Sequence, residues 1–142
     1  MAKVRSSAFQ LVIAPMECFK CHAQTLVGAI VAPVGAEAWD DEDEESQWRP
    51  VDEMMPLDQV REVSANLAAV LPPLLVTLYL DHSHTADTEY WINHCSSCGV
   101  PIGDGHTQSE PDGPFFAWPH AGKIGKLKAL GDGQVTCSMP YF

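Results

Sequence analysis

The chain has 142 residues, of which 46% are hydrophobic and 19% are charged, and its formal net charge is −11. A chain of this length can bury roughly 68% of its unfolded surface, so we expect one folded domain over residues 1–142 rather than disorder. The acidic balance argues against a protein that binds nucleic acid through its phosphates, because that affinity comes mainly from lysine and arginine. Residues 37–110 hold 16 of the 19 acidic residues, so the negative charge is concentrated in the middle of the chain.

The first half of the chain predicts two strands, a loop and a helix. Apolar and β-branched residues between turn residues predict strands at Phe9–Ile13 and Thr25–Ala32. Residues 37–50 are predicted to be an acidic loop insertion that is mobile. A helix is predicted from about Pro56 to Val70, because proline suits a first helical position and the apolar residues follow a spacing of three and four. Pro72-Pro73 is expected to end this helix.

The second half of the chain predicts strands joined by tight turns. Strands are expected at Leu75–Leu80 and Glu89–Asn93, with Asp81–Thr88 as the hairpin connection between them. Apolar segments on either side of Gly131-Asp132-Gly133 predict a further hairpin at the end of the chain. The sequence therefore predicts an α+β fold with a small antiparallel sheet and one principal helix.

The sequence also bears on localisation. The longest apolar run, Leu67–Leu80, has 14 residues and is broken by prolines, whereas a membrane-spanning helix needs about 20. The N-terminal apolar stretch is short and has no cleavage site typical of a signal peptide. We expect a cytoplasmic protein, and in that compartment paired cysteines favour metal or redox chemistry over disulfides.

Four of the five cysteines form two Cys-x-x-Cys pairs, Cys18–Cys21 and Cys95–Cys98. A two-residue spacer lets one tight turn present two sulfur atoms to one metal, and structural zinc prefers four such ligands in a tetrahedron. Gly99 follows the second pair and supplies a permissive backbone, and His22 occupies the equivalent place after the first. The pattern predicts one structural zinc per chain, held by all four cysteines and joining the two halves of the fold. Iron in the same tetrahedral site is an alternative.

The long spacer between the two pairs does not exclude a shared site. Cys21 and Cys95 are separated by 73 residues. Compared with a spacer of about 15 residues, the longer loop costs roughly 1.4 kcal/mol more to close. Structural zinc contributes on the order of 10–16 kcal/mol, which exceeds that cost.

Three other interpretations of the cysteines remain open. Cys18-Phe19-Lys20-Cys21-His22 matches the attachment pattern of c-type haem, which requires export and leaves the second pair unexplained. Either pair could be a thioredoxin-like redox couple, although neither lies at a clear strand-to-helix turn. Simple buried or disulfide-bonded cysteines are the third interpretation, and Cys137 is expected to be a buried thiol.

The segment from Tyr90 to Gly99, with Gly103-Asp104 and Glu110–Phe116 after it, resembles a pattern in uncharacterised bacterial zinc-ribbon proteins. Those proteins also carry an earlier Cys-x-x-Cys followed by an apolar strand, as Cys18–Cys21 is followed here by Thr25–Ala32. The resemblance covers about a third of the chain and implies a single metal site made by the four cysteines. It implies no particular activity, and His22 and the acidic insertion depart from the pattern.

The histidines offer the second constellation that could hold a metal. His82 and His84 lie close together in sequence, and His106 follows Asp104, so a second metal site of a metalloenzyme is an alternative function. In a loop, however, two histidines two residues apart need not share a face, and turn chemistry alone explains the polar residues around them. No HExxH motif, nucleophile elbow, phosphate loop or dinucleotide fingerprint is present, which favours a protein that is not an enzyme.

Six consecutive acidic residues form the most biased segment of the chain. They are flanked by two tryptophans, a residue type enriched in binding hot spots, so the segment could present an acidic face to a basic protein. The other interpretation is a solvated loop that only aids solubility. The predicted contact residues are Trp39, Asp40, Asp41, Glu42, Asp43, Glu44, Glu45 and Trp48.

The sequence therefore predicts a zinc-stabilised interaction protein that binds a basic protein partner. An inhibitor of the immunity or antitoxin type, covering a basic toxin, is one concrete form. The alternatives are the metalloenzyme with a histidine site and a nucleic-acid-associated zinc ribbon, which the net charge disfavours.

Overall fold

The computed structural model describes residues 1–120 and 125–138. In this part of the chain the fold is rich in strands, arranged in two antiparallel sheets, with one α-helix and one short π-helical turn. The elements are β1 (Ala2–Glu17), β2 (Gln24–Ala32), β3 (Glu37–Asp40), β4 (Arg49–Pro50), β5 (Met55–Pro56), β6 (Glu62–Val63), α1 (Ala65–Leu74), β7 (Leu78–Ser83), β8 (Thr88–His94), β9 (Pro101–Ile102), η1 (Gly105–Ser109) and β10 (Lys126–Cys137).

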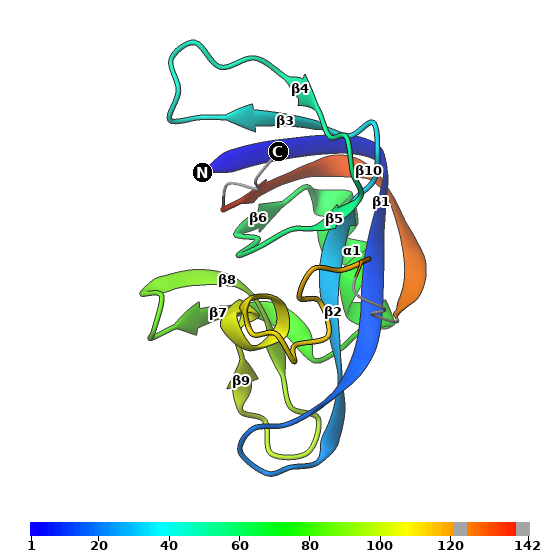
Figure 1. Cartoon of the computed structure of the whole chain (residues 1–142), viewed down its shortest axis with the longest axis vertical. Helices are drawn as coiled ribbons and strands as arrows, with labels where there is room; N and C mark the ends of the chain where they lie inside the picture. The colour runs from blue at the N-terminus through cyan, green and yellow to red at the C-terminus, as the bar shows by residue number, and fades with distance from the viewer. Residues whose placement is uncertain (121–124, 139–142) are drawn as a thin grey trace.

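The larger sheet is organised around the long strand β1. Its first residues pair with β3, its second half pairs with β2, and β10 pairs along nearly its whole length. The short strands β4, β5 and β6 extend the sheet from β3, β2 and β10. Figure 1 shows β1, β2 and β10 running beside one another, with the hairpin of β3 and β4 at one end.

Apolar residues on both faces of the larger sheet build the core. In β1, Leu11 and Val12 are both fully buried but belong to different hydrophobic clusters, and Ile30 and Val31 in β2 divide in the same way. Successive side chains of a strand point to opposite faces, so the continuous apolar sequence of these strands is buried from two sides. Helix α1 contributes Leu67 and Leu71 to the first cluster.

The smaller sheet has the order β7-β8-β9. Its hairpin β7–β8 confirms the predicted pairing, although β7 begins three residues later than expected and continues to Ser83. The turn between β1 and β2 and the turn between β8 and β9 lie close together at the lower end of the molecule in Figure 1. Each of these two turns carries one Cys-x-x-Cys pair.

Two sequence predictions about elements are wrong. The helix begins at Ala65 rather than Pro56, because residues 55–56 and 62–63 are strands that pair with the larger sheet. The helix also continues through Pro72-Pro73 to Leu74. Each proline removes one helical hydrogen bond. Most of the stability of a helix in a protein comes from packing of its apolar face, however, and Leu71, directly before the prolines, is fully buried.

The predicted C-terminal hairpin is also wrong, because residues 126–137 form the single strand β10. The pairing of β10 with β1 changes register around Phe9, which lies opposite Gly131. Gly131 has a φ of 101°, a conformation that glycine adopts without strain, so the glycines make an irregularity in one strand rather than a reversal. The predicted acidic loop at 37–50 has a strand at each end, β3 and β4.

Candidate metal centre

The structure brings the two Cys-x-x-Cys pairs together from opposite sheets. The first pair lies in the turn between β1 and β2, and the second lies in the turn between β8 and β9. Their four Sγ atoms all lie within 4.8 Å of one another. Within the described residues, this is the only group of three or more cysteine, histidine or acidic side chains with ligand atoms so close.

The two turns have the same backbone hydrogen bonds. The N–H of Cys18 donates to the carbonyl of Ala23 at 2.9 Å, and the N–H of Cys95 donates to that of Val100 at 3.0 Å. In each turn the residue after the second cysteine donates back to the carbonyl of the first cysteine, at 3.0 and 2.9 Å. Each Cys-x-x-Cys segment thus lies in a separate six-residue turn of the same kind.

The residue that follows each pair has the backbone conformation that the sequence predicts. Gly99 has a φ of 77° and His22 has a φ of 63°. A positive φ is uncommon for residues other than glycine, but histidine is among those in which it is enriched. The two turns therefore match in conformation although only one of them contains glycine.

The spacing of the sulfur atoms fits a tetrahedral thiolate site. The Sγ atoms of Cys18 and Cys98 are 3.8 Å apart, and those of Cys21 and Cys95 are 3.6 Å apart. Zinc–sulfur bonds of about 2.3 Å in a regular tetrahedron place neighbouring sulfurs about 3.8 Å apart. Cys18 and Cys95 are buried and Cys21 and Cys98 are exposed, so each turn offers one inner and one outer ligand.

Backbone N–H groups prepare one of the inner cysteines to be a thiolate. The N–H groups of Cys98 and Ser97 donate to Sγ of Cys95 and lower the pKa of its thiol to about 6, against the opposing effect of burial. The N–H of Val100 favours the thiolate of Cys98, but desolvation and the neighbouring thiols raise the pKa of Cys98 to about 11. The thiolate of Cys95 therefore forms readily. A divalent metal would supply the positive charge that stabilises the thiolates of the other three cysteines.

Two buried polar side chains that the sequence analysis did not select hold the two sheets together beside this cluster. The Asn93 amide in β8 accepts a hydrogen bond from the N–H of Gly28 at 2.8 Å and donates to its carbonyl at 2.9 Å. Thr25 in β2 accepts from the N–H of Ser96 at 3.0 Å and donates to its hydroxyl at 3.3 Å. These contacts join β2 to β8 and to the second cysteine turn, and a sequence contains no signal that pairs such distant residues.

The residue before Cys95 is also held firmly. His94 is buried, and its Nε2 lies 2.8 Å from Oδ2 of Asp81 and its Nδ1 lies 3.1 Å from the carbonyl oxygen of Thr77. Its ring stacks on Tyr79 with the ring centroids 3.8 Å apart. The hydrogen bond from His94 lowers the pKa of Asp81. Strand β8 therefore enters the second cysteine turn in one fixed orientation.

The three histidines of the alternative prediction do not form a second metal site in the described structure. His82, His84 and His106 line one cavity of about 540 Å³, but their ring nitrogens are not gathered at ligand distance in the described structure. His82 pairs with Asp87 at 3.7 Å, and His106 pairs with Glu110 at 3.3 Å. The metalloenzyme interpretation therefore has no support from this geometry.

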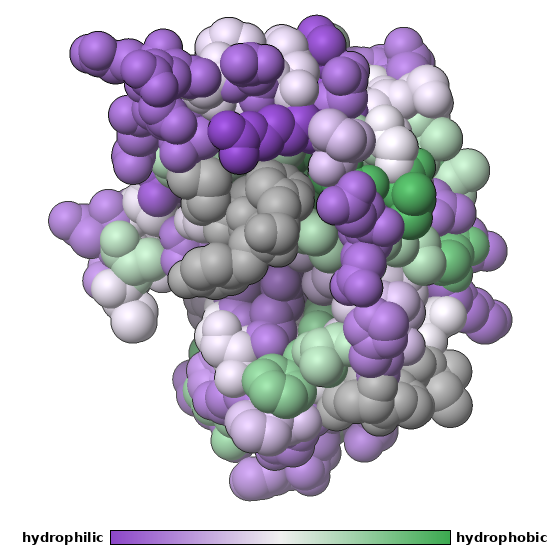
Figure 2. Space-filling view, turned by 45° about the horizontal axis from the view of Figure 1, so that its top comes forward, coloured by the Kyte–Doolittle hydropathy of each residue, from purple (hydrophilic) through white to green (hydrophobic). Residues whose placement is uncertain are grey.

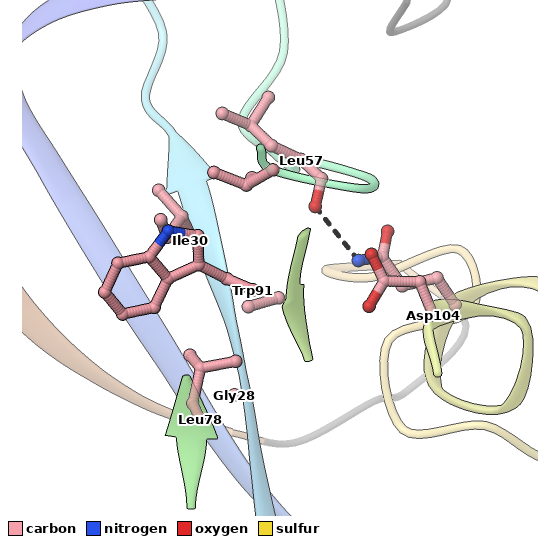
Figure 3. A pocket seen from close by; sticks show the side chains of 9 residues that line it. Gly28, Ile30, Leu57, Leu78, Trp91 and Asp104 are labelled. Carbon is pink, nitrogen blue, oxygen red and sulfur yellow. Dashed lines mark hydrogen bonds between the residues drawn. The ribbon is translucent and has the colours of Figure 1, made fainter. Parts of the chain in front are cut away.

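A buried carboxyl group lies at one end of a smaller cavity between the sheets. Figure 3 shows Asp104 beside the hydrogen bond from Gln108 to the carbonyl of Leu57, with Ile30 and Trp91 further along the same cavity. Asp104 accepts a hydrogen bond from the N–H of Gln59 at 2.7 Å. Desolvation raises the pKa of Asp104 well above its ordinary value, which indicates a carboxyl group that keeps its proton more strongly than an exposed one.

The acidic run lies on the hairpin of β3 and β4, away from the cysteines. Asp41–Glu45 are exposed, while Trp39 and Trp48 are half-buried and pack edge to face with their centroids 5.5 Å apart. The Arg5 guanidinium lies 3.8 Å above the ring of Trp48. The indoles are therefore engaged within the hairpin rather than fully presented to solvent.

The fifth cysteine is separate from the cluster. Cys137 is fully buried in the first hydrophobic cluster, at the end of β10, and burial raises the pKa of its thiol to about 12. It behaves as a small apolar core residue, as the sequence predicts.

Comparisons with known proteins give no relative for this chain. No family model matches it, and neither the curated proteins nor the solved structures contain a match. The resemblance to zinc-ribbon proteins therefore stays a prediction. No helix in the described part of the chain is long and apolar enough to cross a membrane.

Proposed function

We propose that this protein is a zinc-stabilised interaction protein in which Cys18, Cys21, Cys95 and Cys98 hold one structural zinc ion. The observation that carries the proposal is the convergence of four Sγ atoms within 4.8 Å from two turns of the same geometry. Four thiolates complete a tetrahedral shell and leave no open position for water or substrate, which is typical of structural rather than catalytic zinc. The metal would supply the charge that holds four thiolates together and would join β1–β2 to β8–β9.

The metal proposal is tested by measuring what the purified protein binds. We expect about one zinc per chain after expression, and replacement by Co²⁺ should give the absorption of a tetrahedral cobalt site with strong thiolate charge-transfer bands. Iron in place of zinc in the isolated protein would keep the four ligands but overturn the identity of the metal. A metal-free protein that also fails to bind Co²⁺ would contradict the site itself.

The second part of the proposal assigns the acidic run as a contact surface for a basic protein. Figure 2 shows hydrophilic side chains gathered over the hairpin of β3 and β4, where Asp41–Glu45 are exposed. Of these, Asp41 and Glu42 contact the N-terminal ammonium group at 3.5 and 3.2 Å, and no arginine or lysine of the described residues forms an ion pair with the rest. Such a negative surface attracts basic proteins and speeds their association.

An inhibitor of the immunity or antitoxin type is the concrete form of this proposal. Its support is the small size of the chain, the net charge of −11, and the projecting acidic hairpin. The packing of Trp39 against Trp48 gives the hairpin a rigid base, so the carboxylates would be presented without a large ordering cost on binding.

Removing the charges of the run tests this surface. With Asp40–Glu45 changed to serine and glutamine, the protein should remain folded, because a single exposed substitution usually changes the free energy of unfolding by no more than about 0.5 kcal/mol and only Asp40 of the six is partly buried. We expect the variant to lose the basic proteins that the unaltered chain retains in a parallel pull-down, and to associate more slowly with a captured partner, with a weaker dependence of k_on on salt.

A matched control removes six exposed charges elsewhere. The control variant neutralises Asp52, Glu53, Glu62, Asp87, Glu89 and Asp112. If the two variants lose the same partners and the same association rate, net charge rather than the hairpin explains the effect. Unchanged association kinetics in the hairpin variant would assign the acidic run to solubility alone. A Trp39→Ala variant should mainly raise the dissociation rate constant of the captured partner, because it removes a large aromatic side chain from the contact surface.

A further inference from the structure

The cavity of about 540 Å³ beside the first cysteine turn is not explained by the metal centre or by the acidic hairpin. None of the four metal-ligating cysteines lines it, and its volume falls within the range of small-molecule sites, about 300–1,000 Å³. Its wall includes five ring side chains, Phe19, His82, His84, Tyr90 and His106. We propose that this cavity binds a neutral, planar heteroaromatic molecule, which stacks on the pair formed by Phe19 and His106.

The first support is an aromatic pair with an uncovered apolar surface. The rings of Phe19 and His106 are stacked with their centroids 4.5 Å apart and an angle of 12° between their planes. Phe19 remains 49% exposed although it stacks on His106, so part of its apolar surface is open at the wall of the cavity. A flat ligand ring would cover this surface, and a stacked aromatic contact contributes about 0.5–1.5 kcal/mol beyond the burial of area.

The second support is the absence of charged side chains from the wall. Among the described residues that line the cavity there is no lysine, arginine, aspartate or glutamate, although the chain as a whole has a net charge of −11. A charged ligand would lose water there without gaining an ion pair, which costs several kcal/mol. Asp87 and Glu110 contact two of the wall histidines but are not part of the wall itself, so the wall offers no ion pair to a charged ligand and favours a neutral one.

The third support is the set of hydrogen-bonding groups that the wall offers. One ring nitrogen of His82 faces Asp87, and one ring nitrogen of His106 faces Glu110. These contacts involve one nitrogen of each ring and leave the second nitrogen for a ligand. His82 and His84 meet edge to face with their centroids 5.1 Å apart. Imidazoles both donate and accept, as do the ring edges of heteroaromatic molecules.

The fourth support is the unusual backbone of the wall. His106 lies in the π-helical turn η1, a rare conformation that is frequent at functional sites. Gln59 has a φ of 46° and is held there by its hydrogen bond to the buried Asp104, whose own N–H donates to the hydroxyl of Tyr90 at 3.2 Å. Strained residues that their surroundings hold in place are typical of ligand sites.

The test uses the zinc-loaded full chain and five small probes observed by ligand-detected and protein-detected NMR. Adenine and quinazoline are neutral and planar, benzoate and benzamidine are planar but charged, and cyclohexanol is neutral but not planar. We expect the neutral planar probes to bind at least tenfold more tightly than the others and to shift the imidazole signals of His82, His84 and His106. Equal or absent binding of all the probes would overturn the proposal.

Variants locate the binding. His106→Gln should weaken binding of the neutral planar probes at least fivefold, whereas His120→Gln, an exposed histidine paired with Glu53 outside the cavity, should leave it unchanged. Gly105→Leu adds a bulky side chain at a residue of the cavity wall and should also weaken binding, and because a Cβ at this position meets no atom within 4 Å the fold should tolerate the change. Retained binding in both cavity variants would overturn the assignment, and zinc content with the thermal melting curve verifies that each variant is folded.

This proposal is independent of the identity of a protein partner. A chain that binds zinc and the neutral probes but no basic protein would keep the cavity assignment and refute the acidic surface. The reverse result, a basic partner without probe binding, would refute the cavity alone.

Discussion

Substitution of Cys95 by serine is expected to abolish metal binding and to leave the chain largely unfolded. Cys95 is a buried ligand whose Sγ lies 3.6 Å from that of Cys21, and it also receives backbone hydrogen bonds from its own turn. Binding of structural zinc contributes on the order of 10–16 kcal/mol, whereas the whole stability of a domain is about 5–15 kcal/mol. Loss of the metal therefore removes an amount comparable with the total stability.

Metal content and circular dichroism melting of the same preparation measure this effect. The matched control is Cys137→Ala, because Cys137 is buried in the apolar core away from the cluster. The control should retain one zinc and lose only the stability expected of a small core truncation, about 1–2 kcal/mol. A Cys95→Ser protein with unchanged zinc content would refute the shared site, and one that loses zinc but keeps its melting temperature would refute a structural role for the metal.

Substitution of Asn93 by alanine is expected to lower the free energy of unfolding by about 2–5 kcal/mol. The Asn93 side chain is 1% exposed and satisfies both the N–H and the carbonyl of Gly28, which is itself buried between the sheets. Its removal leaves two buried backbone groups without partners, and each unsatisfied group costs about 1–3 kcal/mol. Urea denaturation monitored by tryptophan fluorescence measures the change.

The control for this prediction is Asn66→Ala. Asn66 also donates its amide to a backbone carbonyl, that of Asp132, but it is exposed, so water replaces the lost hydrogen bond. We expect this variant to lose less than about 1 kcal/mol. If Asn93→Ala costs no more than Asn66→Ala, the two hydrogen bonds to Gly28 do not hold the sheets together.

The sequence by itself determined the features whose cause is local. The two Cys-x-x-Cys turns close through hydrogen bonds within six residues, so their geometry, including the positive φ of His22 and Gly99, follows from the residues of each turn. The strands Thr25–Ala32 and Glu89–Asn93 agree with β2 and β8 to within one residue at each end. Strong apolar and β-branched composition is sufficient to predict such strands.

Only the tertiary structure decided the features that depend on distant partners. The apolar spacing of residues 56–63 fits a helix, but short strands form there because β2 and β10 offer backbone groups to pair with. The glycines at 131–133 are typical of a turn, yet the long partner β1 keeps them in one strand. In both places the gain from completing the sheet exceeds a local preference of about 1 kcal/mol or less per residue.

The difference between local and distant causes also explains why the sequence predicts the four-cysteine site but not the cavity lined by histidines. Four cysteines in two pairs are recognisable as ligands before any fold is known, because their chemistry allows few other roles. His82 and His106 are 24 positions apart, and their common cavity exists only because β7, β8, η1 and the first cysteine turn all contribute residues to one wall. Neither the cavity nor the bond from Asn93 to Gly28 has a local sequence signal, because both are made by side chains that meet only after the two sheets have packed together.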